Sequence, residues 1–65
     1  MTRDEWIDRC ANRYISASNI GRESAHEFAV ACADQQAEVN GSSVTEWDSP
    51  ETAADDDMSY WEGDE

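Results

Sequence analysis

The sequence contains no lysine, and its four arginines all lie within the first 22 residues. A chain with so few cations cannot neutralise a row of phosphates, so we expect no direct binding to DNA, RNA or an anionic membrane. It also lacks an apolar run long enough to cross a bilayer, and its N-terminus lacks the apolar segment of a signal peptide. These absences predict a cytoplasmic protein.

The chain has only 65 residues and two cysteines. This length predicts one small acidic helical domain, residues 1–65, with too little room for a substrate pocket and the shell that would hold it rigid. We therefore expect no enzyme and no cofactor. In a cytoplasmic protein Cys10 and Cys32 are expected to be buried thiols, although a disulfide between them is geometrically conceivable.

Acidic residues are the most prominent feature that is present. The chain carries sixteen of them and a formal net charge of −12; after Arg22 there are thirteen acids and no base. Such a charge distribution repels nucleic acid and attracts basic protein surfaces.

Two helices are predicted in the first forty residues. Over residues 3–17, Thr2 and Glu5 have the spacing of a capping box, and Trp6, Cys10 and Tyr14 recur every fourth residue. Over residues 22–39, with Gly21 as the N-cap, a second apolar stripe ends before the Asn-Gly pair at 40 and 41. This second stripe comprises Ala25, Phe28, Ala29 and Cys32.

A short connection between these helices predicts that they lie antiparallel, which places Cys10 near Cys32 and Tyr14 near Phe28. After a polar connection that includes a brief extended piece, Ser49 and Pro50 have the pattern of an N-cap and a first helical residue. A third helix is then predicted over residues 50–61. The expected fold class is all-α, an antiparallel two-helix hairpin covered by a short third C-terminal helix.

The third segment has two interpretations. Its like charges and short length disfavour an isolated helix, so that it either packs on the hairpin or stays disordered until a partner binds. Trp47, Met58, Tyr60 and Trp61 favour packing, since disordered acidic segments are usually poor in aromatics. Packing would turn a dense set of carboxylates outward as candidate phosphate mimics, namely Glu46, Asp48, Glu51, Asp55, Asp56, Asp57, Glu62, Asp64 and Glu65.

Other candidate sites are weaker. Cys10, His26 and Cys32 do not have the spacing of a compact zinc site, and His26 and Cys32 face apart on one helix, which also argues against a Cys–His nucleophile. The run Asp55–Asp57 lacks the alternating ligands of a calcium loop. The arginines at 3, 9 and 13 are expected to pair with acids of the same chain.

The whole-chain pattern, with strong acidity, a helical core and the ending "DDDMSYWEGDE", resembles that of small acidic proteins of bacteriophages and mobile elements. Among these it is similar to DNA-mimicking anti-CRISPR inhibitors of type I surveillance complexes. The resemblance implies action in the bacterial host cytoplasm. It also implies binding to a DNA-recognition subunit, with carboxylates in the places of phosphates.

The expected function is therefore that of a monomeric inhibitor, which blocks a basic DNA-binding surface of such a complex. The alternative is a phage accessory or structural protein that binds a protein partner through apolar contacts. In that case the acidity serves solubility.

Overall fold

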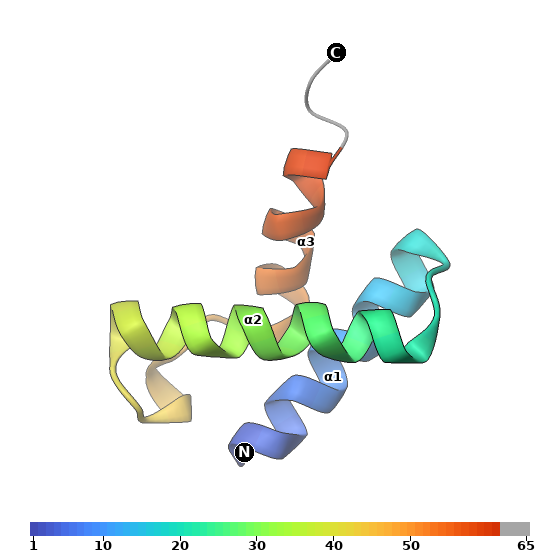
Figure 1. Ribbon diagram of the computed structural model, residues 1–65. Helices are drawn as coiled ribbons and strands as arrows, with labels where there is room; N and C mark the ends of the chain where they lie inside the picture. Colours follow the sequence, from blue (N-terminus) through green and yellow to red (C-terminus); the bar gives the residue numbers. More distant parts are fainter. Residues whose placement is uncertain (62–65) are drawn as a thin grey trace.

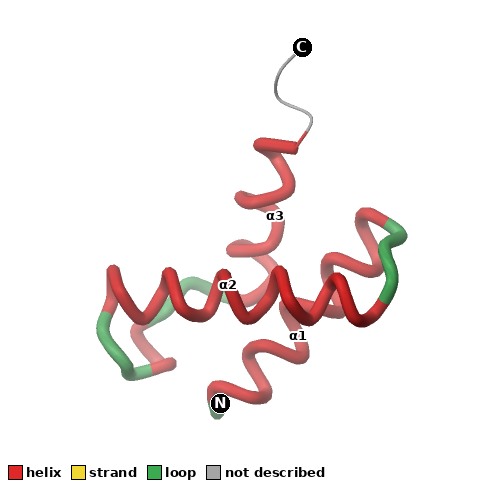
Figure 2. The backbone as a smooth tube through the Cα atoms, viewed as in Figure 1, coloured by secondary structure: helices red, strands yellow, loops and turns green. Residues whose placement is uncertain are grey.

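A computed structural model describes residues 1–61, which form three α-helices and one short turn of 3-10 helix. These are α1 (Arg3–Ser18), α2 (Arg22–Asn40), η1 (Val44–Glu46) and α3 (Pro50–Trp61). In Figures 1 and 2 the chain runs along α1, turns and returns along α2, and after the connection that follows α2 it forms α3, which packs mainly against α1. The predicted all-α hairpin with a third helix is confirmed. None of the described helices combines the length and the apolar character needed to span a membrane.

Local capping explains where the helices begin and end. The Thr2 hydroxyl accepts a hydrogen bond from the Glu5 amide at 3.1 Å, and the Ser49 hydroxyl accepts one from the Thr52 amide at 3.2 Å. Asn19 ends α1 with φ 60°, and Gly41 ends α2 with φ 87°, a conformation that favours glycine. The predicted boundaries of all three helices are thus correct to within one residue.

Helix α1 packs against both other helices and forms the centre of the core. Helix α3 contacts α1 more extensively than it contacts α2. The buried face of α2 is built from small side chains, which allow the helices to approach closely. One continuous core results, comprising Trp6, Ile7, Cys10, Ala11, Tyr14, Ala25, Ala29, Cys32, Ala33, Trp47, Ala53, Ala54 and Met58.

The connection between α2 and α3 differs from its prediction, because its regular part is the 3-10 turn η1 instead of an extended piece. Two tryptophans decide its path. Trp47 is buried and meets Trp6 edge to face, with ring centroids 5.2 Å apart and planes at 88°. The Trp6 indole N–H donates to the Asp48 carbonyl at 2.9 Å, and the Trp47 indole N–H donates to the Gly41 carbonyl at 2.8 Å.

Helix α3 is docked on the hairpin, as the packed interpretation of this segment requires. Ala54 and Met58 are buried, and the Ser18 hydroxyl donates to the Met58 sulfur at 2.8 Å. Trp61 stacks on Tyr14 with ring centroids 5.6 Å apart and remains 41% exposed. Tyr60, also expected to favour packing, is 82% exposed.

Replacing Met58 tests the docking of α3. Met58→Ala is expected to lower the free energy of unfolding by about 2–4 kcal/mol, because it removes buried apolar volume between α3 and α1. Val39→Ala is the control; Val39 is 73% exposed, and its replacement is expected to change stability by no more than about 0.5 kcal/mol. The measurement is urea unfolding followed by far-UV circular dichroism. Equal effects of the two substitutions would contradict a docked α3.

Candidate functional site

The three consecutive aspartates of α3 face three different environments, because successive residues of a helix are rotated by about 100°. Asp55 faces α1, where the Arg13 guanidinium donates to both of its carboxylate oxygens at 2.8 and 3.1 Å. Asp57 accepts a hydrogen bond from the Tyr14 hydroxyl at 2.8 Å. Asp56 is exposed to solvent. The run is therefore not a uniform row of outward charges.

Three of the four arginines pair with acids of the same chain, as predicted. Arg3 lies 2.7 Å from Asp34, and Arg9 lies 3.6 Å from Glu51, in addition to the pair between Arg13 and Asp55. All of these side chains are well exposed, so that each pair adds little stability. Their main effect is to neutralise the acids that they contact. The hydrogen bond from Arg13 lowers the pKa of Asp55 below its usual value.

These pairs divide the predicted phosphate-mimic residues into groups. Glu51 and Asp55 are matched by arginines, and Asp57 is bound to Tyr14. Glu62, Asp64 and Glu65 lie outside the described residues. The predicted residues that are exposed and without a basic partner among residues 1–61 are Glu46, Asp48 and Asp56.

A second acidic surface lies on α2 and was not singled out in the sequence analysis. Four acidic residues occur along this helix at positions i, i+4, i+11 and i+15, within about 60° of one another around the axis. All four are exposed, and Arg3 pairs with one of them, Asp34. They span ~22 Å along the helix, on the side roughly opposite the buried alanines. We call them the α2 row, namely Glu23, Glu27, Asp34 and Glu38.

The spacing in the sequence was sufficient to detect the α2 row. It is the helical periodicity used to find the apolar stripe, applied to acids. The higher density of acids near the C-terminus makes the α2 row less conspicuous in the sequence.

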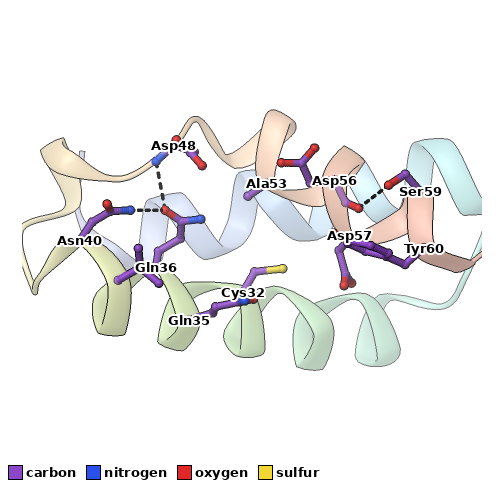
Figure 3. Close-up of a pocket in the computed structure, with 11 residues that line it drawn as sticks. Cys32, Gln35, Gln36, Asn40, Asp48, Ala53, Asp56, Asp57, Ser59 and Tyr60 are labelled. Carbon is purple, nitrogen blue, oxygen red and sulfur yellow. Dashed lines mark hydrogen bonds between the residues drawn. The ribbon is translucent and has the colours of Figure 1, made fainter.

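A groove separates α2 from α3, because both helices pack more closely on α1 than on each other. Its volume is about 480 Å³. Figure 3 shows the Cys32 sulfur pointing into it from α2, and Asp57 reaching toward α2 from the other side. At one end the Gln36 side-chain oxygen accepts from the Asn40 amide at 2.9 Å and from the Asp48 backbone N–H at 3.1 Å. Asp56 and Tyr60 line the opposite end, and the lining residues include no base.

A chain of hydrogen-bonding groups leads from this groove into the core. The Tyr14 hydroxyl lies 2.8 Å from an Asp57 oxygen and 2.9 Å from the Cys32 sulfur. Cys32 in turn forms a hydrogen bond with Cys10, which raises the pKa of Cys10 and lowers that of Cys32 to about 7. Burial and the charge of Asp57 act in the opposite direction and raise the pKa of Cys32. Burial also raises the pKa of Tyr14.

Both cysteines are buried free thiols, as expected, and they do lie together at the contact between α1 and α2. Among residues 1–61 no three His, Cys, Asp or Glu side chains gather in a way that would hold a metal ion. His26 is exposed on α2, whereas Cys32 is buried. The distinctive chemical groups of residues 1–61 are therefore the exposed acidic faces and the two buried thiols.

The pair between Arg13 and Asp55 predicts a pH dependence of stability. Folding lowers the pKa of Asp55. The contribution of this carboxylate to stability is therefore fully present above its unfolded-state pKa of about 4, and it is lost as the pH falls through its folded-state pKa. Asp55→Asn is therefore expected to have a lower melting temperature than the wild type at neutral pH. The difference should diminish as the pH falls below that unfolded value.

The control is Asp56→Asn, which removes the neighbouring exposed carboxylate and is not expected to lower the melting temperature at neutral pH. Melting followed by circular dichroism across the pH range checks both variants. A constant difference between Asp55→Asn and the wild type at every pH would contradict the ion pair.

Comparison with protein-family models, with curated protein sequences and with solved structures gave no match. The features of this chain that bear on its function are the α2 row, the exposed acids of η1, the following connection and α3, and the local pairing that neutralises other carboxylates.

Proposed function

We propose that this protein binds a basic, nucleic-acid-binding protein surface and blocks it by placing carboxylates where phosphates would lie. The observation that carries the proposal is the set of exposed acids that have no basic partner among the described residues. These include Glu23, Glu27 and Glu38 on the α2 row, Glu46 in η1, Asp48 in the connection that follows it, and Asp56 in α3.

The arrangement supports a mimic because helices hold the charges in place. Glu23 and Glu27 are one turn apart, at ~6 Å along the axis of α2. Duplex DNA carries one phosphate per strand every ~3.4 Å, so the row supplies roughly one carboxylate for each two phosphates. This density is sufficient to attract a basic surface over several ångströms, since ions screen exposed charges only beyond a Debye length of ~8–10 Å.

The resemblance to anti-CRISPR inhibitors suggests the class of target. The proposed partner is the DNA-recognition subunit of a bacterial type I CRISPR surveillance complex. Binding there requires no cofactor and no catalysis by this chain. The inhibitor would act as a monomer that competes with target DNA for the same basic residues.

Two triple variants test the proposal and locate the binding face. The first variant removes the three unpaired charges of the α2 row and carries Glu23→Gln, Glu27→Gln and Glu38→Gln. The second variant removes three charges outside α2 and carries Glu46→Gln, Asp48→Asn and Asp56→Asn. All six side chains are exposed, so the fold should be retained.

At low salt, the variant that alters the binding face is expected to weaken inhibition of DNA binding by about tenfold or more. The other variant has the same net charge and serves as its control. The measurement is a competition assay with the purified complex and labelled duplex DNA, repeated at increasing salt. Inhibition that is unaffected by salt and by both variants would contradict phosphate mimicry.

A second function is favoured by the aromatic edge formed by Phe28 and Trp61, whose ring centroids lie 5.1 Å apart. Phe28 is 39% exposed and Trp61 is 41% exposed, so that together they offer an apolar contact for a protein partner. The acidity would then serve solubility. Trp47 is buried and therefore offers no such contact.

Phe28→Ala distinguishes this second function from mimicry. If the aromatic edge binds the partner, this variant should weaken inhibition by about tenfold with little dependence on salt, because the contact is apolar. The same competition assay measures the effect, and Val39→Ala is the matched control at an exposed apolar residue of α2. Unchanged inhibition by Phe28→Ala would rule the aromatic edge out.

A further inference from the structure

Two buried thiols occupy the contact between α1 and α2, and the proposed inhibition does not use them. Cys10 is fully buried and Cys32 is 8% exposed. Each is a free thiol, and each shifts the pKa of the other. Small side chains surround them on α2, where Ala29 and Ala33 are also fully buried. Cys10 lies one turn before Tyr14 on the buried face of α1, and the Tyr14 hydroxyl lies 2.9 Å from the Cys32 sulfur, so the packing of α1 on α2 brings the two thiols to neighbouring levels of the helix contact, as a disulfide requires.

Access to this pair is one-sided. Cys32 lines the groove between α2 and α3, whereas Cys10 lies behind it in the core. Figure 3 shows the Cys32 sulfur at the base of this groove. A small molecule in the groove therefore meets Cys32 first, and Cys10 is positioned behind as the second thiol.

Cys10, Tyr14 and Asp57 influence the protonation of Cys32, the member of the pair that lines the groove. The Tyr14 hydroxyl has one proton and two neighbours, the Asp57 carboxylate and the Cys32 sulfur. While Cys32 is a thiol, it can donate to the tyrosine oxygen and Tyr14 can donate to Asp57. When Cys32 ionises, hydrogen bonds from Cys10 and Tyr14 stabilise the thiolate, which is the reactive form of cysteine.

We propose that Cys32 and Cys10 are a redox-active dithiol, which a cationic low-molecular-weight disulfide oxidises from the groove. The Cys32 thiolate attacks one sulfur of the disulfide, forms a mixed disulfide and releases one thiolate, which takes up the proton that Cys32 lost. Cys10 then attacks the Cys32 sulfur, forms the Cys10–Cys32 bond and releases the second thiol, which receives the Cys10 proton. The protein loses two electrons, and the reagent is reduced to two thiols.

The charge of the groove determines the preference for a cation. Its lining contains Asp48, Asp56 and Asp57, and no basic residue. Around Cys32, the core side contributes neutral Cys10 and Tyr14. An anionic disulfide such as oxidised glutathione is therefore repelled, whereas the two ammonium groups of cystamine are attracted.

The test uses the full chain with cystamine and with oxidised glutathione at low and at high salt. Mass spectrometry is expected to show that cystamine removes two hydrogen masses from the wild type, and peptide mapping is expected to locate a Cys10–Cys32 bond. Dithiothreitol should restore the original mass. The rate of each reagent with the protein is divided by its rate with N-acetylcysteine. At low salt this normalised rate should be about tenfold higher for cystamine than for oxidised glutathione, and high salt should reduce the ratio of the two.

Four variants define the roles of the residues. Cys10→Ala should stop at the mixed disulfide on Cys32, because the resolving thiol is missing, and Cys32→Ala should not react. Asp56→Asn should lower the ratio of the normalised cystamine rate to the normalised rate of oxidised glutathione. Asp8 is an exposed acid on α1, and Asp8→Asn should leave this ratio unchanged.

Wild-type results alone can overturn the proposal. Formation of only a mixed disulfide, or of bonds between two chains, would show that Cys10 does not resolve Cys32. Equal normalised rates for cystamine and oxidised glutathione would show that the acidic groove is not the route.

Discussion

The packing of Trp6 against the segment that leads into α3 is the interaction on which the rest of the structure depends. Trp6 is almost completely buried, contacts Trp47 edge to face, and donates its indole N–H to the Asp48 carbonyl. That carbonyl directly precedes Ser49, the N-cap of α3. The start of α3 is therefore fixed relative to α1 in both position and direction. A 65-residue chain has little other apolar area with which to achieve this.

Once α3 starts there, its sequence determines which groups face α1. Met58 and Ala54 enter the core, Asp55 meets Arg13, and Asp57 meets Tyr14. Docking thus neutralises or binds part of the acidic segment and leaves another part free. The same docking leaves a groove beside α2, because α3 approaches α1 more closely than it approaches α2. Cys32 becomes reachable through that groove, while Cys10 stays covered.

Local signals made much of the fold predictable. Thr2, Ser49 and Gly41 act on backbone groups within a few residues, so their roles follow from sequence alone. The pairing of Tyr14 with Phe28 followed from the short turn and the antiparallel arrangement, and the ring centroids lie 5.6 Å apart. The partial exposure of Trp61 and the exposure of Tyr60 did not follow, because they depend on where α3 ends relative to its neighbours.

Some features of the candidate site likewise follow from the sequence, and others depend on tertiary packing. The sequence by itself determined the net charge, the helices that carry it, and the α2 row, whose periodicity is written in the spacing of its acids. Only the tertiary structure decided that Asp55 is paired, that Asp56 is free and that Asp57 is bound to a tyrosine. Adjacent residues of a helix point in directions about 100° apart, so their environments depend on which neighbour each direction meets. That neighbour is set by long-range packing around Trp6, which no local pattern specifies.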